Sequence, residues 1–161
     1  MINIREIKKE EIFHLDNFLY EAIFIPEGQK KPDNKIIQIP ELLCYIRDFG
    51  KESDLCFVAE SQGDLIGAIW IRHYTEFEKG FGYVDSKTPE LSMSVVEKYR
   101  KQGIGTKLLT KMIEKMIQIG YEQVSLSVDL ENYALKLYKK NGFNIVQSDD
   151  KSAIMIKQFK K

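Results

Sequence analysis

The segment from Glu90 to Ile119 constrains the fold more than any other part of the chain. Residues Glu90–Val96 are typical of a strand, and the apolar positions from Ile104 to Ile119 recur at helical spacing, before Gly120 ends the pattern. The strand and the amphipathic helix are separated by a short turn, Arg100-Lys101-Gln102-Gly103-Ile104-Gly105-Thr106. A strand that leads through a glycine turn into a helix predicts an α/β fold.

This turn has the properties of an anion site. The first backbone N–H groups of a helix lack partners within it, and the helix dipole also favours negative charge there. Gly103 and Gly105 have no Cβ, so a diphosphate can approach the backbone. A dinucleotide fingerprint would need a third glycine where Leu108 stands, and no P-loop string occurs. The alternative is that the two glycines only make a tight turn.

The remaining elements can be placed from apolar periodicity, glycine and proline. Gln62-Gly63-Asp64 marks a hairpin, and the polar segment Phe77–Thr88 is expected to be irregular. No linker divides the chain, so residues 1–161 are expected to form a single domain. The element order β-α-α-β-β-β-α-β-α-β-β implies a mixed α/β sheet with helices on both faces. We expect the other strands over Ile2–Ile7, Asp54–Ser61, Leu65–Tyr74, Tyr121–Val128, Phe143–Gln147 and Ala153–Phe159, and the other helices over Lys9–Ile25, Pro40–Phe49 and Asn132–Lys140.

Composition excludes several function classes. Lys+Arg and Asp+Glu are equal at 24 each, so no overall basic charge favours nucleic acid or an anionic membrane. No apolar run approaches the ~18 residues of a membrane span, and the N-terminus does not resemble a signal peptide. Cys44 and Cys56, with only His14 and His73, form no metal-spaced cluster. We expect two buried thiols in a reducing cytoplasm and no metal.

Two motifs together resemble the GNAT acetyltransferase superfamily. The pattern [RQ]-x-x-G-x-[GA] occurs as Arg100-Lys101-Gln102-Gly103-Ile104-Gly105 after the strand Glu90-Leu91-Ser92-Met93-Ser94-Val95. About thirty residues later, Asn132-Tyr133-Ala134-Leu135-Lys136-Leu137-Tyr138 and Asn141-Gly142-Phe143 are similar to the family's A-x-x-L-Y-x-x-x-G-F signature. The resemblance implies a mixed, mostly antiparallel, twisted sheet of about seven strands with four helices, splayed between the fourth and fifth strands.

The resemblance also implies acetyl-CoA as cosubstrate. Backbone groups of Met93, Ser94 and Val95 are expected to bond the pantetheine arm, with the Val95 N–H directed at the thioester oxygen. Arg100, Lys101, Gln102, Gly103, Ile104, Gly105 and Thr106 are expected to form the cofactor-binding turn, in which Lys101 to Thr106 hold the pyrophosphate. Lys107 or Lys136 is a candidate for the adenosine 3′-phosphate, although lysines on a helix face are usually only solvated.

Tyr138 is expected to donate a proton to the departing CoA thiolate; the alternative is a core tyrosine.

The sequence departs from the family twice. The usual asparagine position holds Glu131, so Asn132, one residue later, either bonds pantetheine or caps the helix. A strand glutamate is absent from Ser125-Leu126-Ser127. Glu90 is therefore the first candidate for the base, directly or through water, and Glu97 a weaker one; the alternative for Glu90 is an exposed charge at a strand end.

The acceptor is expected to enter between the first two helices and the central strands, near Ile25, His73 and Tyr74. Aromatic rings with Glu27 would accommodate a cationic amine, while sheet packing of Trp70 and surface exposure of Arg72 are the alternatives. The function expected is transfer of an acetyl group from acetyl-CoA to a primary amine of a small molecule or protein, by direct attack in a ternary complex. The alternative is a non-catalytic CoA-binding or regulatory domain. A homodimer through the C-terminal strands is a further expectation, because edge strands need cover. The acceptor-contacting residues named by this interpretation are Phe24, Glu27, Trp70, Arg72 and Tyr83.

Overall fold

The computed structural model describes residues 1–159, and its centre is one seven-stranded sheet with the strand order β1-β2-β3-β4-β5-β7-β6. Five of the neighbouring pairs are antiparallel, and only β4 and β5 are parallel. This arrangement confirms the predicted mixed, mostly antiparallel sheet. The strands are β1 Ile2–Glu6, β2 Leu55–Ser61, β3 Asp64–Arg72, β4 Glu90–Val95, β5 Gln123–Asp129, β6 Asn144–Ser148 and β7 Ser152–Gln158.

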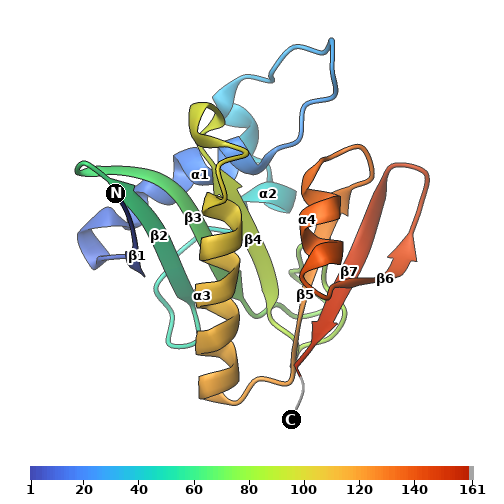
Figure 1. The fold of residues 1–161 in the computed structure, drawn as a ribbon. Helices are drawn as coiled ribbons and strands as arrows, with labels where there is room; N and C mark the ends of the chain where they lie inside the picture. The colour runs from blue at the N-terminus through green and yellow to red at the C-terminus, as the bar shows by residue number, and fades with distance from the viewer. Residues whose placement is uncertain (160–161) are drawn as a thin grey trace.

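Four α-helices cover the two faces of the sheet (Figure 1). α3 (Ile104–Ile119) and α4 (Ala134–Lys140) lie on one face, and α1 (Leu15–Ala22) and α2 (Pro40–Leu43) lie on the other. Leu108, Met112 and Met116 of α3 are fully buried against the sheet, where apolar contact with β2 to β5 forms the larger core. The second core lies under α1, around Phe18 and Trp70. Sheet and helices together confirm the expected architecture.

β4 and β5 pair only at one end. Glu90 lies opposite Ser125, and the Ser125 N–H donates to the Pro89 carbonyl at 3.1 Å. Beyond this point the described part of the chain shows no further pairing between the two strands. The expected splay between the fourth and fifth strands is therefore present. Of the two cavities described below, the smaller is lined by both strands and the larger by β4.

The first predicted helix, Lys9–Ile25, is wrong in part. The chain forms a 3-10 helix over Lys9–His14 and an α-helix only over Leu15–Ala22. Ile23 is already extended, with φ −71° and ψ 119°. Pro26 disfavours helical backbone in the residue before it, so the helix has to end before the last apolar positions of the pattern.

The second predicted helix, Pro40–Phe49, keeps only its first turn as α-helix. Side chains of β3 donate hydrogen bonds to backbone carbonyls in the residues that follow this turn. Trp70 Nε1 donates to the Tyr45 carbonyl at 3.1 Å, and Arg72 Nη1 donates to the carbonyls of Cys44 and Arg47 at 3.2 and 2.7 Å. The segment is thus anchored to the sheet in part by the carbonyls of Cys44 and Tyr45, which a helix continuing to Phe49 would have used internally.

Other local predictions are confirmed. Gln62 and Gly63 have φ values of 50° and 85° and connect β2 to β3 as a two-residue turn. Residues 77–88 contain no strand or helix of their own.

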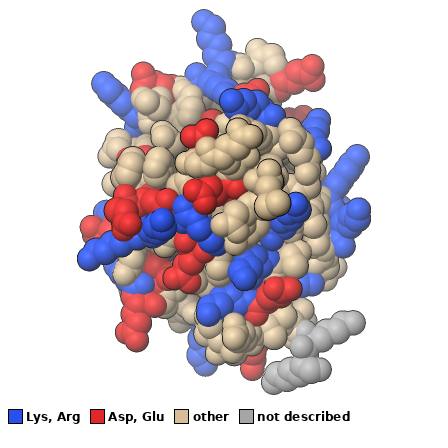
Figure 2. Space-filling model, turned by 60° about the vertical axis from the view of Figure 1, so that its left-hand side comes forward, with Lys and Arg blue, Asp and Glu red and all other residues tan. Residues whose placement is uncertain are grey.

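No helix in residues 1–159 has the length and apolar character needed to cross a membrane. On the face shown in Figure 2, basic and acidic side chains are interspersed.

Candidate active site

The glycine turn places free N–H groups at the start of α3. Gly103 precedes the helix in the left-handed conformation, with φ 83°. The first helical bond found there runs from the Lys107 N–H to the Gly103 carbonyl at 3.2 Å. The N–H groups of residues 104–106 therefore have no partner within the helix and are available to an anion. Gly105 brings this turn close to its neighbours, since a Cβ there would lie 3.3 Å from Leu137 Cδ2.

Arg100 fixes the turn in place instead of pointing into open solvent. Its Nε donates to the Val95 carbonyl at 2.8 Å, and its Nη2 donates to Glu21 Oε2 at 3.0 Å and to the Glu21 carbonyl at 3.1 Å. The guanidinium thereby joins the end of β4 to α1. Gln102 turns away, donating to the Lys98 carbonyl at 3.2 Å, and does not line the cavity that the other residues of the turn enclose.

The larger cavity, of about 710 Å³, lies between the glycine turn, the end of α1, β4 and α4. Such a volume suits a cofactor-sized ligand. Most of the residues predicted to hold acetyl-CoA line it: Met93, Ser94, Val95, Arg100, Lys101, Gly103, Ile104, Gly105, Thr106 and Asn132. The free N–H groups at one end of this cavity and its apolar walls fit a ligand with a diphosphate and a long, narrow arm.

The backbone N–H and carbonyl groups of successive β4 residues face β3 and β5 in turn. The Val96 N–H donates to the Ile66 carbonyl of β3 at 2.9 Å, and the Pro89 carbonyl accepts from β5. Successive residues of a strand direct their N–H groups to opposite edges, so Met93 and Val95 present theirs to the splay. Ser94 differs from the prediction. By the same alternation its backbone N–H and carbonyl face β3 and not the splay, while its hydroxyl donates to the Phe18 carbonyl at 2.6 Å.

A second cavity, of about 340 Å³, adjoins the first through shared walls. Phe24, Met93, Asn132 and Tyr138 line both. Glu90 and Asp129 are the acidic side chains in the second cavity, and no Lys, Arg or His is among the described residues that line it. Its apolar walls come from α1, α2, β4, β5 and the irregular segment, and include Leu19, Ile23, Leu42, Phe81, Leu91 and Val128.

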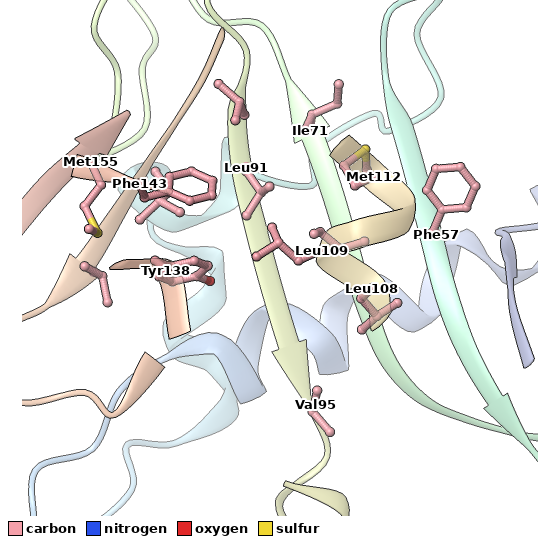
Figure 3. Packing of buried hydrophobic residues seen from close by; sticks show 14 of the residues in the cluster. Phe57, Ile71, Leu91, Val95, Leu108, Leu109, Met112, Tyr138, Phe143 and Met155 are labelled. Carbon is pink, nitrogen blue, oxygen red and sulfur yellow. The ribbon is translucent and has the colours of Figure 1, made fainter. Parts of the chain in front are cut away.

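Tyr138 lies between the two cavities. It is 6% exposed and packs edge-on against Phe143, with ring centroids 5.4 Å apart. Figure 3 shows the two rings side by side, across from Leu91 of β4. Burial raises the pKa of the Tyr138 hydroxyl, so the group carries its proton at neutral pH. Tyr138 is therefore a core tyrosine that also lines both cavities, and its role as the proton donor stays a prediction.

Glu90 lies on the face of β4 that carries α1 and α2, and it is 3% exposed. Its Oε2 accepts from the Tyr45 hydroxyl at 2.6 Å and from the Gly82 N–H at 3.1 Å, whereas Oε1 has no partner among the described residues. Burial raises the pKa of Glu90 to about 7, although these two bonds act to lower it. The alternative of an exposed charge at a strand end is therefore wrong. Sequence analysis did not identify Tyr45, because the partner hydroxyl is distant in sequence.

Asn132 caps the last helix, since its Oδ1 accepts from the Ala134 N–H at 2.9 Å, and it also lines both cavities. Lys136 lines the larger cavity, where Lys101 Nζ lies 5.4 Å from the ring centroid of Tyr133. Lys107 is exposed and does not line it. Within residues 1–159 no group of three or more His, Cys, Asp or Glu side chains is placed to hold a metal ion.

The sequence also matches the model of a known protein family. Residues 11–143 match the model of the acetyltransferase (GNAT) family. The chain belongs to this family. It is 32% identical over 155 residues to N-alpha-acetyltransferase 30 from Dictyostelium discoideum, covering 90% of this chain and 80% of that protein. It is 38% identical over 95 residues to N-alpha-acetyltransferase from Sulfurisphaera tokodaii, a match that spans 57% of that relative.

Solved structures of low sequence identity share the fold. PaiA N-acetyltransferase from Thermoplasma acidophilum, in complex with coenzyme A, superimposes with a TM-score of 0.70 at 21% identity and 99% coverage of both chains. The ribosomal-protein-S18-alanine N-acetyltransferase from Escherichia coli gives a TM-score of 0.69 at 18% identity, covering 100% of this chain and 96% of that chain. Family and relatives together identify this GNAT protein as an acetyl-CoA-dependent acetyltransferase that acts on an amine.

The predicted acceptor residues of this GNAT protein do not gather at one place. Phe24 lines both cavities, but Glu27 is exposed in the loop after α1 and lines neither. Tyr83 is half-buried outside both cavities, with Lys79 Nζ 5.5 Å from its ring centroid. Phe81 and Asp129 line the second cavity instead, and neither had a sequence motif to mark it.

Trp70 and Arg72 are corrections of a different kind, because both are structural. Trp70 is fully buried, and its only polar atom binds the Tyr45 carbonyl. Arg72 is 4% exposed and pairs with Asp54 at 3.1 Å, in addition to the carbonyls of the segment after α2. The two side chains share a sheet face, as predicted, but α2 and its following turns cover that face.

Proposed function

We propose that this GNAT protein transfers the acetyl group by direct attack in a ternary complex, with Glu90 as the base and Tyr138 as the acid. One observation carries the proposal: the two cavities share a wall at Met93 and Tyr138, while Glu90 lies in the smaller cavity only. The larger cavity would hold acetyl-CoA and the smaller one the amine. The two substrates would then meet in the splay between β4 and β5.

Acetyl-CoA supplies the acetyl group as a thioester. The N–H groups of residues 104–106 would bind the diphosphate, and the Met93 backbone would bond the pantetheine arm along the splay. The Val95 N–H would face the thioester oxygen, where negative charge grows as the amine attacks. The Val95 carbonyl, in the next peptide group, is already bound by Arg100, which holds this end of β4 in place before the ligand arrives.

The proton steps follow from the two side chains. Glu90 would accept a proton from the acceptor ammonium, directly or through a bridging water, so that the nitrogen lone pair can form the new N–C bond. As the C–S bond breaks, the Tyr138 hydroxyl would give its proton to the thiolate. A pKa of about 7 suits a base that works near neutral pH.

The smaller cavity also limits the acceptor. Its two carboxylates would attract a cation, and none of its described lining residues is a Lys, Arg or His that could neutralise an anionic group beside the amine. The apolar walls favour an amine next to an apolar side chain. The relatives named N-alpha-acetyltransferases point in the same direction. We therefore propose that the acceptor is the α-amine of a polypeptide whose first side chain is apolar, and not a free amino acid.

The test begins with calorimetric titration of acetyl-CoA, using ATP and NADH as controls for selectivity. Thiol release is then measured with peptides that have a free N-terminus, with the same peptides blocked, and with free amino acids and polyamines. We expect release with the free peptides only. Glu90→Gln and Tyr138→Phe should lower the rate, while Glu114→Gln, exposed on α3, should not. Selective binding without thiol release from any amine would instead support the non-catalytic alternative.

We also propose a single acetyltransferase domain over residues 1–161 that acts in the cytoplasm and has no nucleic-acid or membrane partner. Cys44 and Cys56 are both free and buried, which is consistent with a reducing compartment.

A homodimer through the C-terminal strands is supported by β6, an edge strand with exposed Ile145 and Val146. The mass in solution tests it, and a monomer would dispose of it.

A further inference from the structure

Tyr45 forms a buried hydrogen-bond network that the mechanism above does not use. Its hydroxyl donates to Glu90 Oε2 at 2.6 Å and accepts from the Phe81 N–H at 2.7 Å. The Gly82 N–H donates to the same carboxylate oxygen at 3.1 Å. Both donors to Glu90 therefore act on one oxygen, while the described residues offer none to Oε1.

The backbone around Tyr45 is anchored to β3. Trp70 donates to the carbonyl of Tyr45 itself, and Arg72 donates to the carbonyls of Cys44 and Arg47. The ring is 7% exposed and meets Tyr74 edge-on, with centroids 5.8 Å apart. Because β3 anchors the backbone on each side of Tyr45, the hydroxyl has little freedom to leave the carboxylate.

Two glycines allow the irregular segment to close over this pair. A Cβ at Gly80 would overlap both Glu90 Oε1 and the Tyr45 hydroxyl, and a Cβ at Gly82 would overlap the backbone of Leu126 and Ser127 in β5. The segment can therefore approach only with glycine at both positions. Its close approach also brings the Gly82 N–H to Glu90 and buries the carboxylate.

We propose that Tyr45 is a positioning residue of the reaction, whose hydroxyl fixes the orientation of the Glu90 carboxylate and favours its charged form. The inference rests on the proposed role of Glu90 as the base. A hydrogen bond donated to a carboxylate stabilises the anion, and here it opposes the effect of burial. Without Tyr45, the desolvated carboxyl would be neutral over more of the pH range in which a base is required.

The other titratable groups around Glu90 do not replace Tyr45. Cys44, from the same segment, and Tyr74, after β3, are buried with raised pKa values, so both are neutral near pH 7. Arg72 lies opposite Glu90 in the sheet register but is engaged by Asp54 and two carbonyls. From β5, Ser125 lies opposite Glu90 in the sheet register and Asp129 lines the same cavity, but neither donates a hydrogen bond to the Glu90 carboxylate among the described residues. Burial also keeps the Tyr45 hydroxyl protonated, by raising its pKa.

The experiment compares Tyr45→Phe with Tyr74→Phe. Tyr74 is a matched control, because its ring packs on Tyr45 in the same cluster and its buried hydroxyl has no partner among residues 1–159. We measure kcat/KM against pH with a peptide acceptor, and the titration of the Glu90 carboxyl by ¹³C NMR. In Tyr45→Phe, the acidic limb and the NMR midpoint should both move to higher pH by about one unit. Above the new limb, kcat/KM should stay below the wild-type value, because the Glu90 carboxylate is no longer fixed in one orientation.

The outcomes separate this inference from the proposed function. If Glu90→Gln removes the acidic limb but Tyr45→Phe leaves it in place, the role of Tyr45 is overturned while the base stands. If Glu90→Gln keeps the wild-type profile, the base assignment fails, and the dependent role of Tyr45 fails with it. An NMR midpoint that does not rise in Tyr45→Phe overturns the inference whatever the activity. An equal shift in Tyr74→Phe also overturns it, because loosened packing would then be the cause.

Discussion

Replacing Glu90 with glutamine should remove a loss of stability that the wild-type protein suffers as the pH rises from 4.5 to about 7. Burial raises the pKa of Glu90 from its ordinary value of 4.5 to about 7 in the folded chain. An acid whose pKa is higher in the folded state contributes stability below pH 4.5, and this contribution is lost as the pH rises to about 7. The interval, about 7 minus 4.5, is about 2.5 pH units, and each unit corresponds to about 1.4 kcal/mol. As the pH rises through this interval, the unfolding free energy of the wild-type protein therefore falls by about 3 kcal/mol, and that of the glutamine variant does not show this fall.

The assay is urea denaturation of both proteins from pH 4 to pH 8. The difference in unfolding free energy between them isolates Glu90, because the other ionisable groups titrate in both proteins and their contributions cancel. Any constant effect of the amide on packing also cancels when the difference is compared across pH. We expect the variant to gain about 3 kcal/mol relative to wild type between the two ends of the range. A difference that stays constant with pH would refute the reasoning, because Glu90 would then ionise alike in the folded and unfolded chains.

Three further predictions concern the proposed acid, a buried ion pair and the cofactor turn. Tyr138→Phe should lower kcat by about 10²- to 10⁴-fold and leave calorimetric binding of acetyl-CoA unchanged; an unaltered kcat would exclude Tyr138 as the acid. Arg72→Met should lower the unfolding free energy by about 3–5 kcal/mol in urea denaturation, because it leaves buried Asp54 without its partner; an unchanged midpoint would contradict the structural role. Gly105→Val should weaken acetyl-CoA binding by about tenfold or more in calorimetry, because a side chain there meets Leu137; wild-type affinity would contradict the close approach.

The sequence predicted best those elements whose causes are local. α3 was placed to the residue, because its apolar stripe and the glycine at each end lie within one segment. The hairpin at Gln62 and Gly63 was found for the same reason. The splay between β4 and β5 was inferred through resemblance to the family, since no local pattern in either strand marks it.

Long-range contacts explain the errors. The helix expected over Pro40–Phe49 stops after Leu43, because Trp70 and Arg72 bind the carbonyls that would have continued it. No periodicity within the segment reveals that competition. The same two side chains were expected at the acceptor site because of their type, whereas their burial depends on the packing of α2 against β3. Tyr45 was missed because its relation to Glu90 exists only in three dimensions.

The one-ended pairing of β4 and β5 has a thermodynamic consequence. The β4 backbone groups of Met93 and Val95 that face β5 lack a strand partner, so the sheet is incomplete in main-chain bonds where the two strands diverge. A pantetheine arm lying there would act as a short surrogate strand and would connect two halves of the sheet that otherwise meet only near Glu90 and Ser125. Amide exchange in these strands should therefore slow when the ligand binds. At a hundredfold excess over its Kd, such a ligand raises the unfolding free energy by about 2.7 kcal/mol. Resistance of the chain to heat and proteolysis would thus report the cellular supply of the acyl donor.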